Sequence, residues 1–163
     1  MKKFAVVLCL VLSLVMALSS CSAFFEGVEA GLAGTQKEEK FLELVSENQE
    51  LLDDYADDIY RNWYDCIYND KFNEDINTAI YSAMLDNSAN ISRIEANNEQ
   101  IKELYKDAKD GELEDEVKAV MQAYNEYYAF VMEVSGSFKS YSASKESLKK
   151  ALATALRNLE AEL

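Results

Sequence analysis

The chain contains no proline and no histidine, and only five glycines in 163 residues. Proline and glycine are the residues that most readily end a helix, so their scarcity favours long helices. The absence of histidine excludes histidine-ligated metal sites, Ser-His-Asp and Cys-His catalysis, and most general-base chemistry at neutral pH. The missing residue types therefore predict a helical protein with few routes to catalysis.

Cysteine is scarce as well. Cys9 and Cys21 lie close to the N-terminus, and Cys66 is the only other cysteine of the chain. A single internal thiol cannot form an intrachain disulfide framework. Because Cys66 stands at helical spacing from Ile59 and Trp63, we expect it to be a small residue of the core.

Basic residues are few in comparison with acidic ones. The chain has 16 Lys and Arg against 30 Asp and Glu, a formal net charge of −14. Such a surface repels nucleic acid and anionic lipid head groups, so no binding of DNA or RNA is expected. Residues 21–70 contain 13 acids and three bases, whereas residues 145–163 have a net charge of +1. Either the C-terminal helix lies against the acidic first helix, or both are separate solvated faces.

The N-terminus, MKKFAVVLCLVLSLVMALSSCS, carries the most distinctive motif. Two lysines, Lys2 and Lys3, precede an apolar run over residues 4–18. This run is shorter than the roughly 20 residues that span a bilayer comfortably. A charged start, a short apolar core and small residues before a cut site are typical of a secretory signal.

The segment ends in Leu18-Ser19-Ser20-Cys21, which resembles the lipobox of bacterial lipoprotein precursors. The resemblance implies cleavage between Ser20 and Cys21 and a diacylglyceryl thioether on Cys21. Two or more acyl chains give stable anchoring. The expected location is thus extracytoplasmic, on the bacterial cell membrane, or on the outer membrane of a cell that has one. An ordinary cleaved signal peptide or an uncleaved anchor is the alternative.

The predicted helical domain covers residues 36–163, after a signal peptide at 1–20 and a flexible tether at 21–35 that begins with the lipidated cysteine. Its first helix is expected over residues 36–69, because apolar positions recur there at steps of three and four. The positions on this stripe are Phe41, Val45, Asn48, Leu52, Tyr55, Ile59, Trp63 and Cys66.

A second helix is expected over residues 73–109. Its apolar stripe is weaker because asparagines interrupt it, and a buried asparagine such as Asn87 can fix the register of a helix at some cost in stability. Asp110 and Gly111 follow, and we expect Gly111 to end this helix in the left-handed conformation.

From Glu112 onward the apolar positions keep one phase through Tyr141 and on to Leu159. Two architectures fit: a single long helix, or a break within residues 135–144 and a fourth helix that starts at Ser144. We favour the break, because one glycine and five serines in ten residues weaken a helix. The expected fold is all-α, an antiparallel up-down bundle of three long helices and a shorter C-terminal helix.

Two constellations suggest chemistry, and neither is complete. Ser142 and Lys145, like Ser147 and Lys150, have the S-x-x-K spacing of penicillin-binding enzymes, but the accompanying S-D-N and K-T-G elements and any strand pattern are missing. Adjacent carboxylates recur at 53–54 and 57–58, but a di-metal bundle needs Glu-x-x-His pairs, and the spacing before the glycine at 111 fails the EF-hand pattern. We expect solvated charged faces, no metal and no cofactor.

The candidate partner-binding patch is a set of aromatic residues at the end of the first helix. Aromatic side chains combine apolar area with a polar handle and recur at interfaces and sugar-binding surfaces. Either the neighbouring helices bury this set or it forms an exposed patch, and burial is the reading that we favour. The set comprises Tyr60, Trp63, Tyr64, Tyr68 and Phe72.

Together these features favour a non-catalytic, lipid-anchored envelope protein whose acidic bundle binds a protein or wall component. In organisation alone it resembles small all-helical lipoproteins of unknown function in bacteria and their mobile elements. A surface immunity or exclusion lipoprotein of a mobile element is the second hypothesis. An envelope hydrolase that uses only carboxylates is the third and least favoured, because a slender bundle offers little cleft. The apolar stripe of the third helix is filled either within the chain or by a second copy, so a homo-oligomer remains an alternative.

Overall fold

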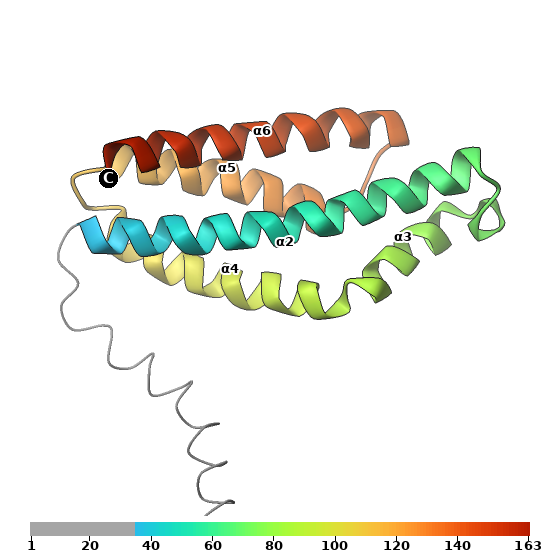
Figure 1. The fold of residues 1–163 in the computed structure, drawn as a ribbon, viewed down its shortest axis with the longest axis horizontal. Helices are drawn as coiled ribbons and strands as arrows, with labels where there is room; N and C mark the ends of the chain where they lie inside the picture. The colour runs from blue at the N-terminus through green and yellow to red at the C-terminus, as the bar shows by residue number, and fades with distance from the viewer. Residues whose placement is uncertain (1–34) are drawn as a thin grey trace, which may run out of the picture. The chain divides into compact units, whose positions relative to one another are not determined.

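The computed structural model describes residues 35–163, which form an antiparallel helical bundle (Figure 1). The helices are α2 (Thr35–Tyr68), α3 (Ile76–Asp86), α4 (Ser88–Ala108), α5 (Glu114–Met132) and α6 (Phe138–Glu162), with a 3-10 turn, η1 (Phe72–Glu74), after α2. No strand occurs in this part of the chain, and the expected all-α bundle is confirmed. The predicted signal peptide, Ser20, Cys21 and nearly all of the predicted tether lie outside the described residues.

Helix α2 is the centre of the bundle and packs against every other helix. All eight residues of its predicted stripe are buried, and none is more than 5% exposed. Cys66 is among them at 3%, as expected of a small core residue. Burial of each large apolar side chain contributes about 1.5–3 kcal/mol, so this stripe is the main source of the stability of the bundle.

The predicted second helix is two helices, α3 and α4, that meet at Asn87. The backbone of Asn87 has φ −101° and ψ 14°, outside the helical range, yet the helical bonds to the carbonyl of Ala83 and from the amide of Ile91 persist. Its side chain donates both to that Ala83 carbonyl (3.0 Å) and to the carboxylate of Asp58 on α2 (2.7 Å). Side-chain bonds of this kind compete with the helix and bend it.

The break between α5 and α6 lies earlier than predicted. Helix α5 ends at Met132, Gly136 turns the chain with φ +88°, and α6 begins at Phe138 rather than Ser144. Ser137 caps α6: its hydroxyl accepts from the amide of Ser140, whose hydroxyl accepts from the amide of Ser137. This reciprocal cap satisfies two free amides at once. The last helix is therefore longer than α5, with 25 residues against 19.

The role expected for Gly111 is wrong. Among the described glycines only Gly136 has a positive φ. Gly111 instead makes room for the buried carboxylate of Glu38, since a Cβ at this position would collide with Oε1 of that side chain. A close approach, not a left-handed turn, thus accounts for the glycine.

Candidate functional site

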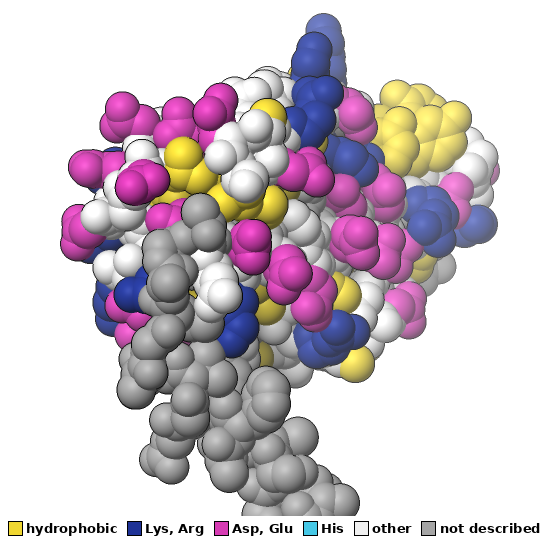
Figure 2. Space-filling model, turned by 60° about the vertical axis from the view of Figure 1, so that its left-hand side comes forward, with side chains coloured by type: hydrophobic (Ala, Val, Ile, Leu, Met, Phe, Trp, Pro, Cys, Tyr) yellow, Lys and Arg dark blue, Asp and Glu magenta, His cyan; other side chains and the backbone are white. Residues whose placement is uncertain are grey.

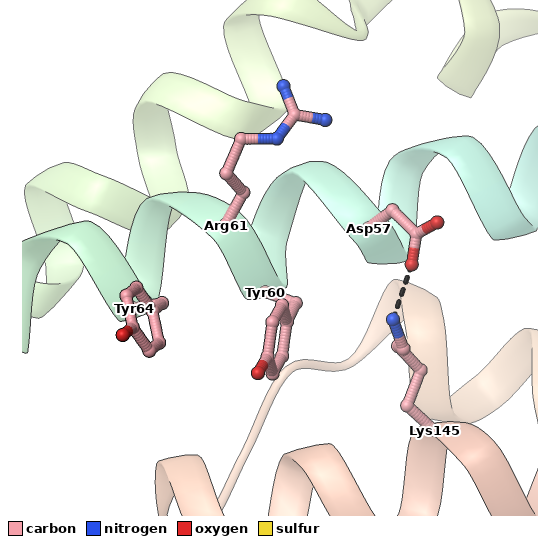
Figure 3. Close-up of a pocket in the computed structure, with 5 residues that line it drawn as sticks. All are labelled: Asp57, Tyr60, Arg61, Tyr64 and Lys145. Carbon is pink, nitrogen blue, oxygen red and sulfur yellow. Dashed lines mark hydrogen bonds and ion pairs between the residues drawn. The ribbon is translucent and has the colours of Figure 1, made fainter.

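The predicted aromatic patch lies where the last turns of α2 meet the first turn of α6. Tyr60, Tyr64 and Tyr68 are four residues apart and share one side of α2. Their rings gather round Phe138, with centroid distances of 5.1 Å for the first and 6.2 Å for the other two. We call these four residues the tyrosine surface. Figure 3 shows Tyr60 and Tyr64 side by side on the same face of α2.

Trp63 belongs to the core rather than to this surface. It is 4% exposed, and its ring packs against Phe138 and Tyr141 at centroid distances of 6.0 and 5.5 Å. Tyr141 in turn stacks on Phe130 of α5 at 4.8 Å. This continuous aromatic packing from α2 through α6 to α5 holds the start of α6 in place.

The rest of the predicted set is only partly covered. Tyr60 and Phe72 are half-buried, the latter in the turn η1. Tyr64 and Tyr68 are 42% and 60% exposed. The favoured reading, in which neighbouring helices bury the whole set, is therefore wrong for these two tyrosines. The reason is that Phe138 is the first residue of α6, so no further turn of that helix extends over them.

A shallow groove of about 500 Å³ lies beside the rings (Figure 3), lined by Asp57, Tyr60, Arg61, Tyr64 and Lys145. Lys145 reaches across from α6 to pair with Asp57, and its ammonium lies 4.9 Å from the centroid of the Tyr60 ring, within cation–π range. Arg61 points away from both rings in Figure 3 and pairs with a neighbouring carboxylate of its own helix. The groove thus combines aromatic faces with a held cation and an anion.

Three members of this groove, Asp57, Arg61 and Lys145, were not assigned to a binding site in the sequence analysis. Lys145 is the one that its burial sets apart. It is only 8% exposed, although it is charged. The signal that could have found it is its position: it continues the apolar phase that runs from Tyr141 to Leu152. A lysine on a buried stripe needs a carboxylate within reach, and Asp57 supplies it.

The neighbouring carboxylates of α2 are not simply a solvated face, as had been expected. Asp53 accepts a 2.5 Å hydrogen bond from the hydroxyl of Tyr127 on α5 and pairs with Lys149 on α6 at 2.9 Å. Burial, followed by the bond to this carboxylate, raises the pKa of Tyr127, and the same carboxylate raises the pKa of Lys149. Asp54, the other carboxylate at positions 53–54, is exposed and has no such partner among the described residues.

The second carboxylate pair also links helices. Asp57 bonds to Lys145 of α6, and Asp58 accepts from Asn87 between α3 and α4. Of the two arrangements left open for the charges, the first is therefore confirmed: the C-terminal helix lies against the acidic first helix. Ion pairs between these segments were invisible in the sequence because the partners are far apart along the chain.

The S-x-x-K spacings form no reactive pair in the described residues. Lys145 bonds to Asp57 rather than to Ser142, while Ser147 and Lys150 are exposed on α6. Within residues 35–163, no three His, Cys, Asp or Glu side chains are placed to hold a metal ion. The thiol of Cys66 is buried, and this burial raises its pKa.

Comparisons with protein-family models, with curated proteins and with solved structures find no match to this chain. None of the described helices combines the length and the apolar character needed to cross a membrane. Figure 2 shows acidic side chains spread over one face with basic ones between them. Hydrophobic side chains form a large group at one edge of this face and smaller groups among the charged ones.

Proposed function

We propose that this chain is a lipid-anchored protein of the bacterial envelope that acts by binding a protein or wall component, not by catalysis. The anchor is inferred from the lipobox that ends in Cys21. The binding role depends chiefly on one observation, the exposure of Tyr64 and Tyr68 at 42% and 60% beside an open groove. Large aromatic rings at a surface are characteristic of recognition sites.

The tyrosine surface suits binding for a physical reason. The rings already pack on one another. The centroids of Tyr64 and Tyr68 are 4.7 Å apart, and the ring of Phe138 on α6 packs against both. These side chains are therefore already held in place before a partner binds. Binding restricts their motion little further, and the entropic cost of association is lower. Asp57, whose side chain is about half exposed at the groove even though it is paired with Lys145, offers a polar contact that gives direction to an otherwise apolar interaction.

The carboxylates support the non-catalytic part of the proposal. A carboxylate-only hydrolase needs two acidic groups that face a shared cleft. Asp53, Asp57 and Asp58 are instead engaged with side chains of other helices. Their role is structural, since each neutralises or satisfies a polar group at a helix–helix contact.

The anchor is tested by Cys21→Ser. We expect this variant to leave the membrane fraction and to change electrophoretic mobility, because the residue can no longer carry a thioether-linked lipid. A serine at the neighbouring Cys9, which lies inside the predicted signal, is the matched control and keeps wild-type behaviour. A Cys21→Ser protein that stays membrane-bound with unchanged mobility contradicts the lipoprotein proposal.

The binding surface is tested in intact cells that express the full chain. Chemical crosslinking and mass spectrometry would compare the wild type with a Tyr64→Ser/Tyr68→Ser variant and with Leu163→Ser, an exposed apolar residue at the far end of α6. We expect the double variant alone to lose its crosslinked partner while melting within a few degrees of the wild type, since both rings are exposed. Unchanged crosslinks in the folded double variant contradict the assignment of this surface.

A further inference from the structure

Exposed hydrophobic side chains are confined to one part of the described chain. With the exception of Leu163, every large hydrophobic residue that is exposed there falls between positions 64 and 85. Two of these residues, Tyr64 and Tyr68, belong to the tyrosine surface. Three others lie on one side of α3 and form what we call the α3 surface: Tyr81, Met84 and Leu85, with exposed fractions between 40% and 53%. The remaining two are Ile67 in the last turn of α2 and Ile76 at the start of α3.

The α3 surface is bare because α3 is covered on one side only. Helix α3 packs along α2 and touches α4 and η1, but it makes no contact with α5 or α6 (Figure 1). Its two buried residues, Ala79 and Ala83, are four apart and face α2. Tyr81 and Leu85 are each two residues further on, about 200° round the helix, and so point to the opposite side. A helix that is apolar on both sides is normally covered on both sides.

The segment of the chain that contains this surface is mostly negative in charge. Residues 64–86 contain five acidic residues and one basic residue. The basic residue, Lys71, is already paired with Asp65 at 2.5 Å. Asp70, Glu74 and Asp86 are exposed and have no basic partner among the described residues. The α3 surface therefore belongs to a segment whose exposed carboxylates lack basic partners among the described residues, and one of them, Asp86, directly follows Leu85.

We propose that the α3 surface is a docking site for a basic amphipathic helix of another protein. The apolar face of such a helix would cover Tyr81, Met84 and Leu85, which have the i, i+3, i+4 spacing of helix-to-helix anchors. Its lysines and arginines would meet the unpaired carboxylates of this acidic segment. The 11 residues of α3 give a contact length of about 16 Å, or three turns of a partner helix.

The same charges argue against the other occupants. A second copy of the chain would bring the same acidic segment to the contact, and like charges across an interface are destabilising. An anionic membrane surface is repelled for the same reason. The proposal involves residues outside the tyrosine surface, so it does not depend on the function proposed above.

The test uses the full chain in nanodiscs of zwitterionic lipid, with empty nanodiscs as the blank. Two fluorescent peptides share one leucine stripe, but the polar face is lysine and arginine in one and glutamate in the other. Anisotropy should show binding of the basic peptide alone. We expect Tyr81→Ser/Leu85→Ser to weaken this binding at least tenfold and Leu163→Ser to leave it unchanged.

A second variant preserves the apolar residues and changes only the charge of the acidic segment. Glu74→Lys/Asp86→Lys should weaken the binding of the basic peptide and allow the acidic peptide to bind. Equal binding of both peptides to the wild type, no binding above the blank, or unchanged binding in folded variants overturns the proposal. Two further results would overturn the proposal. One is a dimer of the wild type in sedimentation experiments, and the other is binding of the wild type to anionic vesicles, in either case lost in Tyr81→Ser/Leu85→Ser.

Discussion

The side-chain amide of Asn48 on α2 donates a 2.8 Å hydrogen bond to the hydroxyl of Tyr124 on α5, 76 residues further along the chain. The same amide also donates to the carbonyl of Ile94 on α4 (3.2 Å), and the Tyr124 hydroxyl donates to Oδ1 of Asn98 on α4 (3.1 Å). All three polar side chains are at most 5% exposed. This buried network joins three helices. A shift of any one of them would leave buried polar groups without partners, so the network specifies how the three helices are aligned.

Removing the hydroxyl at the centre of the network should destabilise the fold. We expect Tyr124→Phe to lower the free energy of unfolding by about 1–3 kcal/mol, since it removes bonds to the side chains of Asn48 and Asn98 without giving either a new partner. Urea denaturation measures the change. Tyr128→Phe, a half-buried tyrosine on the same helix, is the matched control and should change stability by less than about 0.5 kcal/mol. Equal losses in the two variants contradict the role given to the network.

The ion pair between Lys145 and Asp57 should contribute more than one on the surface. Lys145 is 8% exposed and Asp57 about half exposed, so the pair is partly screened, and we expect Asp57→Asn to cost about 1 kcal/mol. Glu114→Gln is the control, because Glu114 and Lys118 are both half exposed on one helix, and it should cost at most about 0.5 kcal/mol. Urea titrations at low and high salt would show the difference. The idea is wrong if the two substitutions cost the same.

Buried tyrosines should make the bundle sensitive to alkali. Burial raises the pKa values of Tyr124, Tyr127 and Tyr141 above those of an unfolded chain. The folded state then holds protons that the unfolded state releases above about pH 10, so the stabilisation is complete below that pH and is lost as the pH rises. Each tyrosine adds up to about 1.4 kcal/mol per pH unit to the slope.

Tyr127→Phe should therefore reduce the alkaline slope. The free energy of unfolding would be measured by urea titration across this pH range, with ultraviolet absorbance used to follow tyrosine ionisation. The exposed Tyr68→Phe serves as the control and should reproduce the wild-type slope. An unchanged slope for Tyr127→Phe shows that this hydroxyl is not protected by the fold.

The turn after α2 stores backbone strain. Four non-glycine residues there have positive φ: Asp70 (52°), Phe72 (59°), Asn73 (53°) and Glu74 (59°). A left-handed conformation costs an ordinary residue about 1–2 kcal/mol, and glycine avoids this cost at a smaller loss in chain entropy. Glu74→Gly should thus stabilise the protein by about 0.5 kcal/mol in thermal denaturation. Glu103→Gly, inside α4, should destabilise it by about 1 kcal/mol, and destabilisation of similar size at Glu74 would refute the strain.

Regular periodicity made the helical core predictable. Every member of the stripe on α2 is buried, and the phase that begins at Leu113 continues through Tyr141 and Leu159 as expected. Helix ends were less predictable. Serines at 137, 140 and 144 all have capping chemistry, and the choice among them depended on contacts of Phe138 with the rings of α2.

The exposed surfaces were decided by tertiary structure. Tyr60, Trp63 and Tyr68 belong to one aromatic set in the sequence, yet Trp63 is buried and Tyr68 is mostly exposed. The pattern along one helix depends on residues three and four positions apart, so the amino-acid sequence alone determined which segments are helical and which sides of them are apolar. Whether an apolar side is covered depends on where helices far along the chain begin and end, and only the packing of α3 and α6 against α2 determined that.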